Sequence, residues 1–198
     1  MDISELLNSP MGQSIVRNIA SRLGVKENQA SGAVSMAIPA ILAGMNRNAQ
    51  SEDGAASLHN ALESKHDGSL LDNLSGMLQG HPQELQSDGD GILGHVFGNK
   101  RNVVEKGIAQ KSGISMDKIG PLLAILAPIV MAFLGKEKRQ TNTGAGGLGD
   151  LLGGLLGGGG QAERSSGGIM DMLGGVLDKD GDGSPLNDLL GGFLGGRQ

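Results

Sequence analysis

The stretch Ile19-Ala20-Ser21-Arg22-Leu23-Gly24-Val25 decides the fold, because it recurs 89 residues later as Ile108-Ala109-Gln110-Lys111-Ser112-Gly113-Ile114. The same offset places Pro39 onto Pro128, so that an ungapped match covers roughly 45 residues. Each copy predicts a helix, a glycine stop and a second helix kinked at its proline. The sequence therefore predicts a body made of two related helical units.

The chain divides into a helical body and a glycine-rich tail. We place the body at residues 1–140, with repeat units of about 1–46 and 90–135 joined through a polar middle around residues 47–68. The tail is residues 141–198. Only three residues are aromatic, so the core must come from Leu, Ile, Val, Met and Ala, a composition that favours helices over sheets. The expected fold class is all-α, with a duplicated helix-turn-helix-like body and short amphipathic helices in the tail.

Composition and charge narrow the function classes. The formal net charge is -5 at pH 7, whereas a protein that binds nucleic acid through its phosphates normally carries a basic stripe. The chain contains no cysteine, which excludes disulfides and cysteine-based metal sites and leaves the redox compartment open. The first residues, Met1–Glu5, lack the basic-then-apolar pattern of a signal peptide. We therefore expect a cytoplasmic location.

One apolar run approaches the length of a membrane span. Residues 119–135 carry no charge and are followed by Lys136, Lys138 and Arg139. A spanning helix needs at least about 17 residues, so the run sits at the lower limit, and its two prolines weaken it further. We favour a core helix over membrane insertion.

Three short segments of the tail share one amphipathic pattern. They are Leu148–Leu156, Ile169–Leu177 and Leu186–Leu194, and each places apolar residues at i, i+3, i+4, i+7 and i+8. In each, an aspartate precedes the central apolar pair and a Gly-Gly pair follows it. We name these stretches the Leu/Gly segments. The residues predicted to make contacts are Leu151, Leu152, Leu155, Met172, Leu173, Leu189, Leu190 and Phe193.

The Leu/Gly segments are not expected to be stable alone, because each glycine costs a helix about 1 kcal/mol relative to alanine. Glycine also leaves a flat surface on which another backbone can come close. We therefore expect these segments to dock, either on the body or on copies of themselves. The alternative is a low-complexity tail that stays disordered.

An acidic loop lies between the second and third Leu/Gly segments. The stretch from Asp178 to Ser184 supplies carboxylates at positions 1, 3 and 5, glycine at position 6 and a carbonyl at position 7, as in an EF-hand calcium loop. Position 12 is Leu189 instead of glutamate, so an acid one residue earlier would have to close the shell. The predicted calcium ligands are Asp178, Asp180, Asp182, Ser184 and Asp188. The alternative is a solvated acidic turn without an ion.

Other patterns argue against DNA binding and catalysis. Both repeats have a helix-turn-helix spacing, with Ala20, Gly24 and Val25 in the first and Ala109 and Gly113 in the second. The segments that would read DNA carry little positive charge, so we interpret the spacing as packing geometry. The four histidines show no ligand spacing, and no phosphate-binding loop or nucleophile–base pair is evident. Catalysis is therefore not expected.

Four stretches of the body carry a family resemblance: Met1–Leu7, Ile19–Val25, Ile38–Met45 and Leu122–Gly135. They resemble the YidB-like bacterial proteins of unknown function, and the resemblance covers residues 1 to about 140. The tail with its acidic loop also looks like the tails of longer members. The resemblance implies an all-helical, homeodomain-like fold in a bacterial cytoplasmic protein. It implies no activity, because the family has no established catalytic residues to carry over.

The leading functional hypothesis is a non-enzymatic self-association or scaffold protein. It would be a homo-oligomer that contacts through the Leu/Gly segments and is stabilised by calcium at the acidic loop. Two alternatives stay open: a DNA-associated regulator that uses the helix-turn-helix spacing, and a peripheral membrane protein that docks through Leu148–Leu156. Nucleic acid is not expected as a partner, and a membrane is less favoured than self-association.

Overall fold

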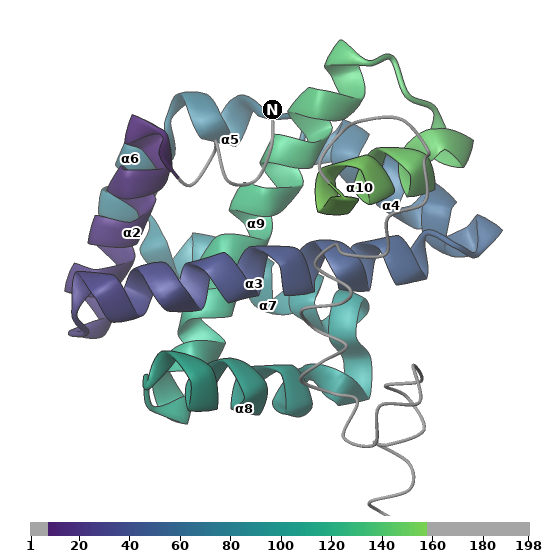
Figure 1. Cartoon of the computed structure of the whole chain (residues 1–198). Helices are drawn as coiled ribbons and strands as arrows, with labels where there is room; N and C mark the ends of the chain where they lie inside the picture. Colours follow the sequence, from purple (N-terminus) through teal and green to yellow (C-terminus); the bar gives the residue numbers. More distant parts are fainter. Residues whose placement is uncertain (1–7, 158–198) are drawn as a thin grey trace, which may run out of the picture. The chain divides into compact units, whose positions relative to one another are not determined.

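The computed structural model describes residues 8–157, all but the last of which belong to one compact unit (Figure 1). Within this range the regular elements are helices and no strand occurs, which confirms the expected all-α class. The elements are α2 (Pro10–Leu23), α3 (Glu27–Asn48), α4 (Glu52–Ser64), α5 (Ser69–Asp72), α6 (Leu74–Gly80), α7 (Pro82–Phe97), η1 (Gly98–Lys100), α8 (Arg101–Ser112), α9 (Met116–Gln140), η2 (Ala145–Gly147) and α10 (Leu148–Gly157).

Helix α9 is the centre of the body. It packs against α2, α3, α4, α5, α7 and α8, and its residues from Leu122 to Gly135 are all buried. By length and composition α9 could cross a membrane, yet 83% of its most apolar stretch is buried inside the body. The run predicted to be a core helix therefore lies in the core of this fold.

Two helix–glycine–helix pairs build much of the body. Gly24 ends α2 and Gly113 ends α8, with φ angles of 59° and 68° in the left-handed region that glycine adopts without strain. The amide of each glycine donates to the carbonyl of an equivalent alanine, Ala20 or Ala109. The long helices that follow, α3 and α9, continue through their internal prolines. The glycine stops thus lie where the sequence placed them.

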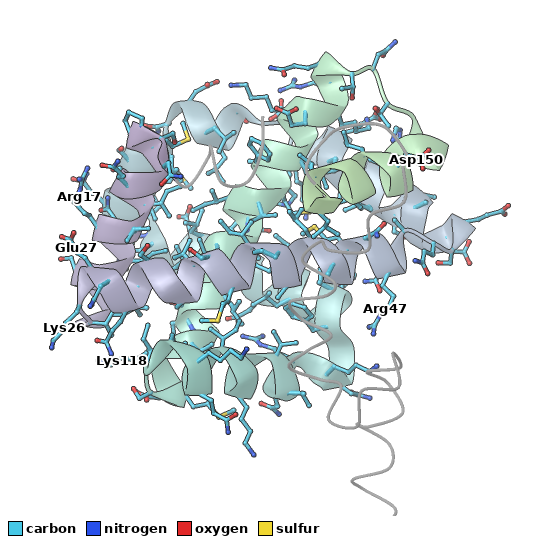
Figure 2. All side chains as sticks on the ribbon, in the orientation of Figure 1. Arg17, Lys26, Glu27, Arg47, Lys118 and Asp150 are labelled. Carbon is cyan, nitrogen blue, oxygen red and sulfur yellow. The ribbon has the colours of Figure 1, made fainter. Side chains whose placement is uncertain are left out.

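The two pairs face each other through reciprocal contacts. Gln29 of α3 donates from Nε2 to the carbonyl of Gly113 at 3.1 Å, and Lys118 of α9 donates from Nζ to the carbonyl of Gly24 at 3.3 Å. Gln29 and Lys118 are equivalent positions of the repeat, as are the two glycines. Lys118 lies beside the turn that carries Lys26 (Figure 2). Each long helix therefore reaches the cap of the opposite pair, while the homeodomain-like character of the units stays a prediction.

Close backbone approaches set the crossing of α7 over α9. A Cβ on Gly89 of α7 would lie 1.7 Å from the carbonyl oxygen of Ala124 in α9. A Cβ on Gly44 of α3 would lie 2.4 Å from Val96 of α7. Glycine at Gly89 thus lets the backbones of α7 and α9 come closer than any side chain would permit, whereas glycine at Gly44 leaves room for the side chains of Val96 and Phe97.

Helix α4 occupies the region that the sequence suggested as a polar connection. It begins at Ser51, whose Oγ accepts from the amide of Gly54 at 3.1 Å, as a helix N-cap should. Leu62 is buried and Leu58 is partly buried against the core. The polar middle that joins the two units is therefore partly helical, and its helix packs on α9.

Candidate functional site

The first Leu/Gly segment is helix α10, and it is docked on the body. Its leucines Leu148 and Leu152, four residues apart on one face, are both 0% exposed and belong to the main hydrophobic cluster. The preceding turn η2 contacts α4, which places the start of α10 against that helix (Figure 1). The seat of α10, as we name the part of the body that buries these two leucines, therefore lies beside α4.

The opposite face of α10 is open. Asp150 is exposed (Figure 2). Gly153 and Gly154 are exposed too, and a Cβ added to either glycine would meet nothing within 4 Å. The Gly-Gly pair of this segment therefore makes no close backbone contact inside residues 8–157, although the sequence suggested that role. What holds α10 is its leucine stripe.

The predicted contact residues fall on both sides of the boundary of the described chain. Leu152 is fully buried by its own body, while Leu151 and Leu155 are partly buried and pack against the same cluster. The remaining predicted contacts lie outside the described residues: Met172, Leu173, Leu189, Leu190 and Phe193. The predicted calcium ligands lie outside them too: Asp178, Asp180, Asp182, Ser184 and Asp188. Between residues 8 and 157, no group of three or more His, Asp or Glu side chains is placed to hold a metal ion.

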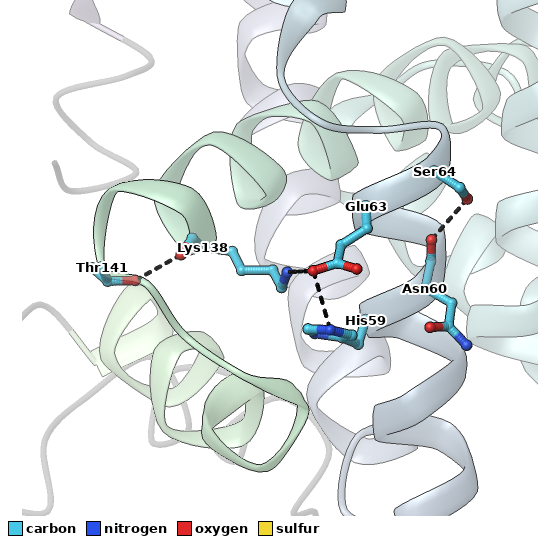
Figure 3. Close-up of polar contacts among 6 residues, drawn as sticks. All are labelled: His59, Asn60, Glu63, Ser64, Lys138 and Thr141. Carbon is cyan, nitrogen blue, oxygen red and sulfur yellow. Dashed lines mark hydrogen bonds and ion pairs between the residues drawn. The ribbon is translucent and has the colours of Figure 1, made fainter.

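A buried lysine fixes the end of α9 to α4 next to the seat. The Nζ of Lys138, a residue only 6% exposed, donates to Oε1 of Glu63 at 2.9 Å, and the same oxygen lies 3.2 Å from Nε2 of His59 (Figure 3). The hydrogen bond from Lys138, and then the charge of His59, lower the pKa of Glu63. One turn later, Thr141 donates from Oγ1 to the carbonyl of Glu137 at 2.9 Å and ends the helix. Residues 141–147, which we name the connector, join α9 to α10 and therefore start from a fixed point.

A second ion pair holds the same turn of α9 to the loop before α5. Arg139 contacts Asp67 from Nη1 to Oδ2 at 3.3 Å, and its Nη2 donates to the Asp67 carbonyl. Hydrogen bonds from Ser69 are the main cause of the lowered pKa of Asp67. Under this loop Gly135 lies so close that a Cβ would come 1.9 Å from the carbonyl oxygen of His66. The last turn of α9 is thus held on two sides.

A groove of about 580 Å³ lies between α3, α4 and α7. His66 lines it and is 6% exposed, with Nε2 3.7 Å from Oδ2 of Asp88, and burial lowers the pKa of His66. Ser51 and Ser57 also line the groove, yet no hydrogen bond joins either serine to a histidine among the residues described. His66 is therefore a buried histidine at the edge of this groove, although nothing in its local sequence indicates burial.

Comparison with known proteins places the body in a family. A model for a bacterial protein of unknown function (DUF937) matches residues 5–137 of the 198. The chain belongs to this family. YidB is a member of it, so the resemblance seen in the sequence is confirmed. No curated protein and no solved structure matches the chain. The DUF937 match ends in the last turn of α9, just before Lys138, so α4, the helix beside the seat, lies in the family region and α10 follows that region.

Proposed function

We propose that this chain is a non-enzymatic self-association or scaffold protein whose Leu/Gly segments are the contacts. The observation that carries the proposal is α10, in which the pattern Leu148, Leu151, Leu152, Leu155 and Leu156 turns its leucines into an apolar cluster. Two further segments repeat that pattern in the sequence. A leucine stripe that docks once is a reason to expect docking wherever it recurs.

The energetics of α10 explain why such a segment needs a partner surface. Complete burial of a leucine contributes about 1.5–3 kcal/mol, so the two buried leucines contribute about 3–6 kcal/mol. The four glycines of the helix each cost about 1 kcal/mol relative to alanine, and ordering the chain costs more. Helix formation in a Leu/Gly segment therefore depends on docking, and the docked state is held by a small margin.

Calcium is the proposed stabiliser of the tail. The loop from Asp178 to Ser184 separates two Leu/Gly segments, and an ion held by its carboxylates would fix the direction in which the chain passes from one segment to the next. The support for this part of the proposal is the spacing of the acids in the sequence.

Light scattering on a sizing column tests the proposed function. The full chain should exceed its monomer mass of 20.2 kDa as concentration rises, whereas a chain ending at Gly160 should stay monomeric because it keeps α10 but lacks the later segments. Both chains are run in calcium and in chelator, and a calcium-dependent mass for the full chain alone supports the ion. A full chain that is monomeric at the highest concentration in both buffers refutes self-association.

The alternatives draw less support. The helix that would read DNA in the second unit is α9, whose apolar stretch is buried, and the net charge is negative. Membrane docking through Leu148–Leu156 requires α10 to leave its seat. Filter binding to duplex DNA and flotation with anionic liposomes serve as the discriminating measurements, and a positive result in either would replace the scaffold proposal.

A further inference from the structure

We propose that the seat of α10 is a receptor for the Leu/Gly segments of a second copy of this chain. This inference rests on the proposed self-association and names the two surfaces that meet in it. The seat is the part of the body that buries Leu148 and Leu152, and the ligand is any segment that presents apolar residues with the same spacing.

The occupant is identified by what fills the seat in its own chain. Two fully buried leucines at i and i+4 anchor α10, and the other leucines of its stripe are partly buried. The equivalent pairs in the other segments are Ile169 with Leu173 and Leu190 with Leu186. The three segments thus carry the same two anchors, whereas residues 8–157 provide one seat. A chain with more segments than seats has ligands left over for other copies.

The attachment of α10 permits exchange. The two ion pairs that fix α9, Lys138 with Glu63 and Arg139 with Asp67, both precede the connector. After Thr141 no ion pair joins the connector or α10 to the body within the described chain. The glycines of α10 with exposed faces add no contact of their own. A segment from another copy therefore competes with the leucine stripe of α10 and with its tether, and with no ion pair.

Two sets of variants of the full chain test this inference. Leu173→Asp with Leu190→Asp removes the residue equivalent to Leu152 from both later segments. Gly174→Asp with Gly191→Asp adds the same charges at positions that correspond to the exposed Gly153. Sedimentation equilibrium should show assembly weakened by about tenfold or more in the leucine variant and nearly unchanged in the glycine control.

The seat itself is tested with Leu152→Asp in the full chain, which releases α10. The variant also carries Leu173→Asp and Leu190→Asp, so that no intact Leu/Gly segment of the chain fills the seat. A labelled peptide with the sequence of residues 184–196 should bind it about tenfold or more tightly than the chain with the two tail substitutions alone in fluorescence anisotropy, because the seat is vacant. The paired control is Gly154→Asp, which adds the charge on the exposed face and should leave peptide binding unchanged. Circular dichroism melting checks that both variants keep the helical body.

The outcomes separate the inference from the proposed function. If the chain assembles and the leucine and glycine variants of the tail behave alike, the seat is not the receptor, although self-association stands. If Leu152→Asp does not strengthen binding of the peptide, the inference is overturned in the same way. A full chain that stays monomeric at all concentrations refutes the proposed function and this inference together.

Discussion

The substitution Gly89→Ala should destabilise the body, although alanine is the better helix former. Gly89 lies in the interior of α7, where replacing glycine by alanine normally stabilises a helix by up to about 1 kcal/mol. Here the added methyl would lie 1.7 Å from the carbonyl oxygen of Ala124, far inside contact distance. That oxygen belongs to the backbone of α9, so the two helices must move apart. Overpacking of this kind costs about 1–3 kcal/mol, and the core around α9 makes the upper end the expectation.

A matched control lies two residues away on the same helix. A Cβ on Gly91 would meet nothing within 4 Å, so Gly91→Ala should show the helix propensity alone and stabilise by up to about 1 kcal/mol. Urea unfolding followed by circular dichroism measures both changes, because the chain has neither tryptophan nor tyrosine for fluorescence. The two substitutions should have opposite signs. If Gly89→Ala stabilises as Gly91→Ala does, the close approach of α7 and α9 is wrong.

Three further predictions concern pH and docking. Burial lowers the pKa of His66 from 6.5, although the charge of Asp88 opposes the shift. As pH drops below 6.5 the unfolded chain therefore takes up the proton first, and the free energy of unfolding should fall. His66→Gln should remove this pH dependence in urea titrations between about pH 7.5 and 5.5. Because the pKa of Glu63 is lowered, its contribution to the free energy of unfolding is present above pH 4.5 and is lost as pH falls through the pKa of the folded state. Lys138→Met should remove this loss of stability in acid, and stability that falls in acid as in the natural chain would contradict the hydrogen bond between Lys138 and Glu63. Leu152→Asp should abolish amide-exchange protection in α10 but not in α7 or α9, as measured by hydrogen–deuterium exchange, whereas protection that survives in α10 would show that this leucine is not an anchor.

The features predicted correctly from sequence are those whose cause is local. Gly24 and Gly113 end their helices because the left-handed conformation after a helix suits glycine, and this requirement needs no knowledge of the rest of the fold. The leucine stripe of α10 is likewise a matter of spacing along one helix. The all-α class followed because most of the apolar residues are not branched at Cβ and aromatics are scarce.

The features that sequence reasoning missed depend on distant partners. Helix α4 looked like a connection because its own apolar residues are few, and it is held by packing on α9 and by the Glu63–Lys138 pair across 75 residues. The need for glycine at Gly89 comes from the backbone of α9, which no local pattern reveals. The burial of His66 could not be predicted, because the residues around it come from three helices that are separate in the sequence. The acidic loop with Asp178 lies outside the described residues, so calcium binding stays a prediction.

The contrast between the fixed end of α9 and the weak hold on α10 has a functional consequence. If the seat is to accept a segment from another copy, α10 must leave it often, and the glycines of α10 keep its docked helix only marginally stable. Changing Gly153 and Gly154 to alanine would leave every contact in place, because a Cβ at either position meets nothing within 4 Å. The two changes would nevertheless favour the docked helix by about 2 kcal/mol. Strengthening this intramolecular competitor by that amount raises the ratio of docked to undocked α10 about 30-fold, so the seat is open about 30-fold less of the time. Self-association should therefore weaken although no contact residue has changed. Nonspecific association between exposed leucines does not predict this outcome.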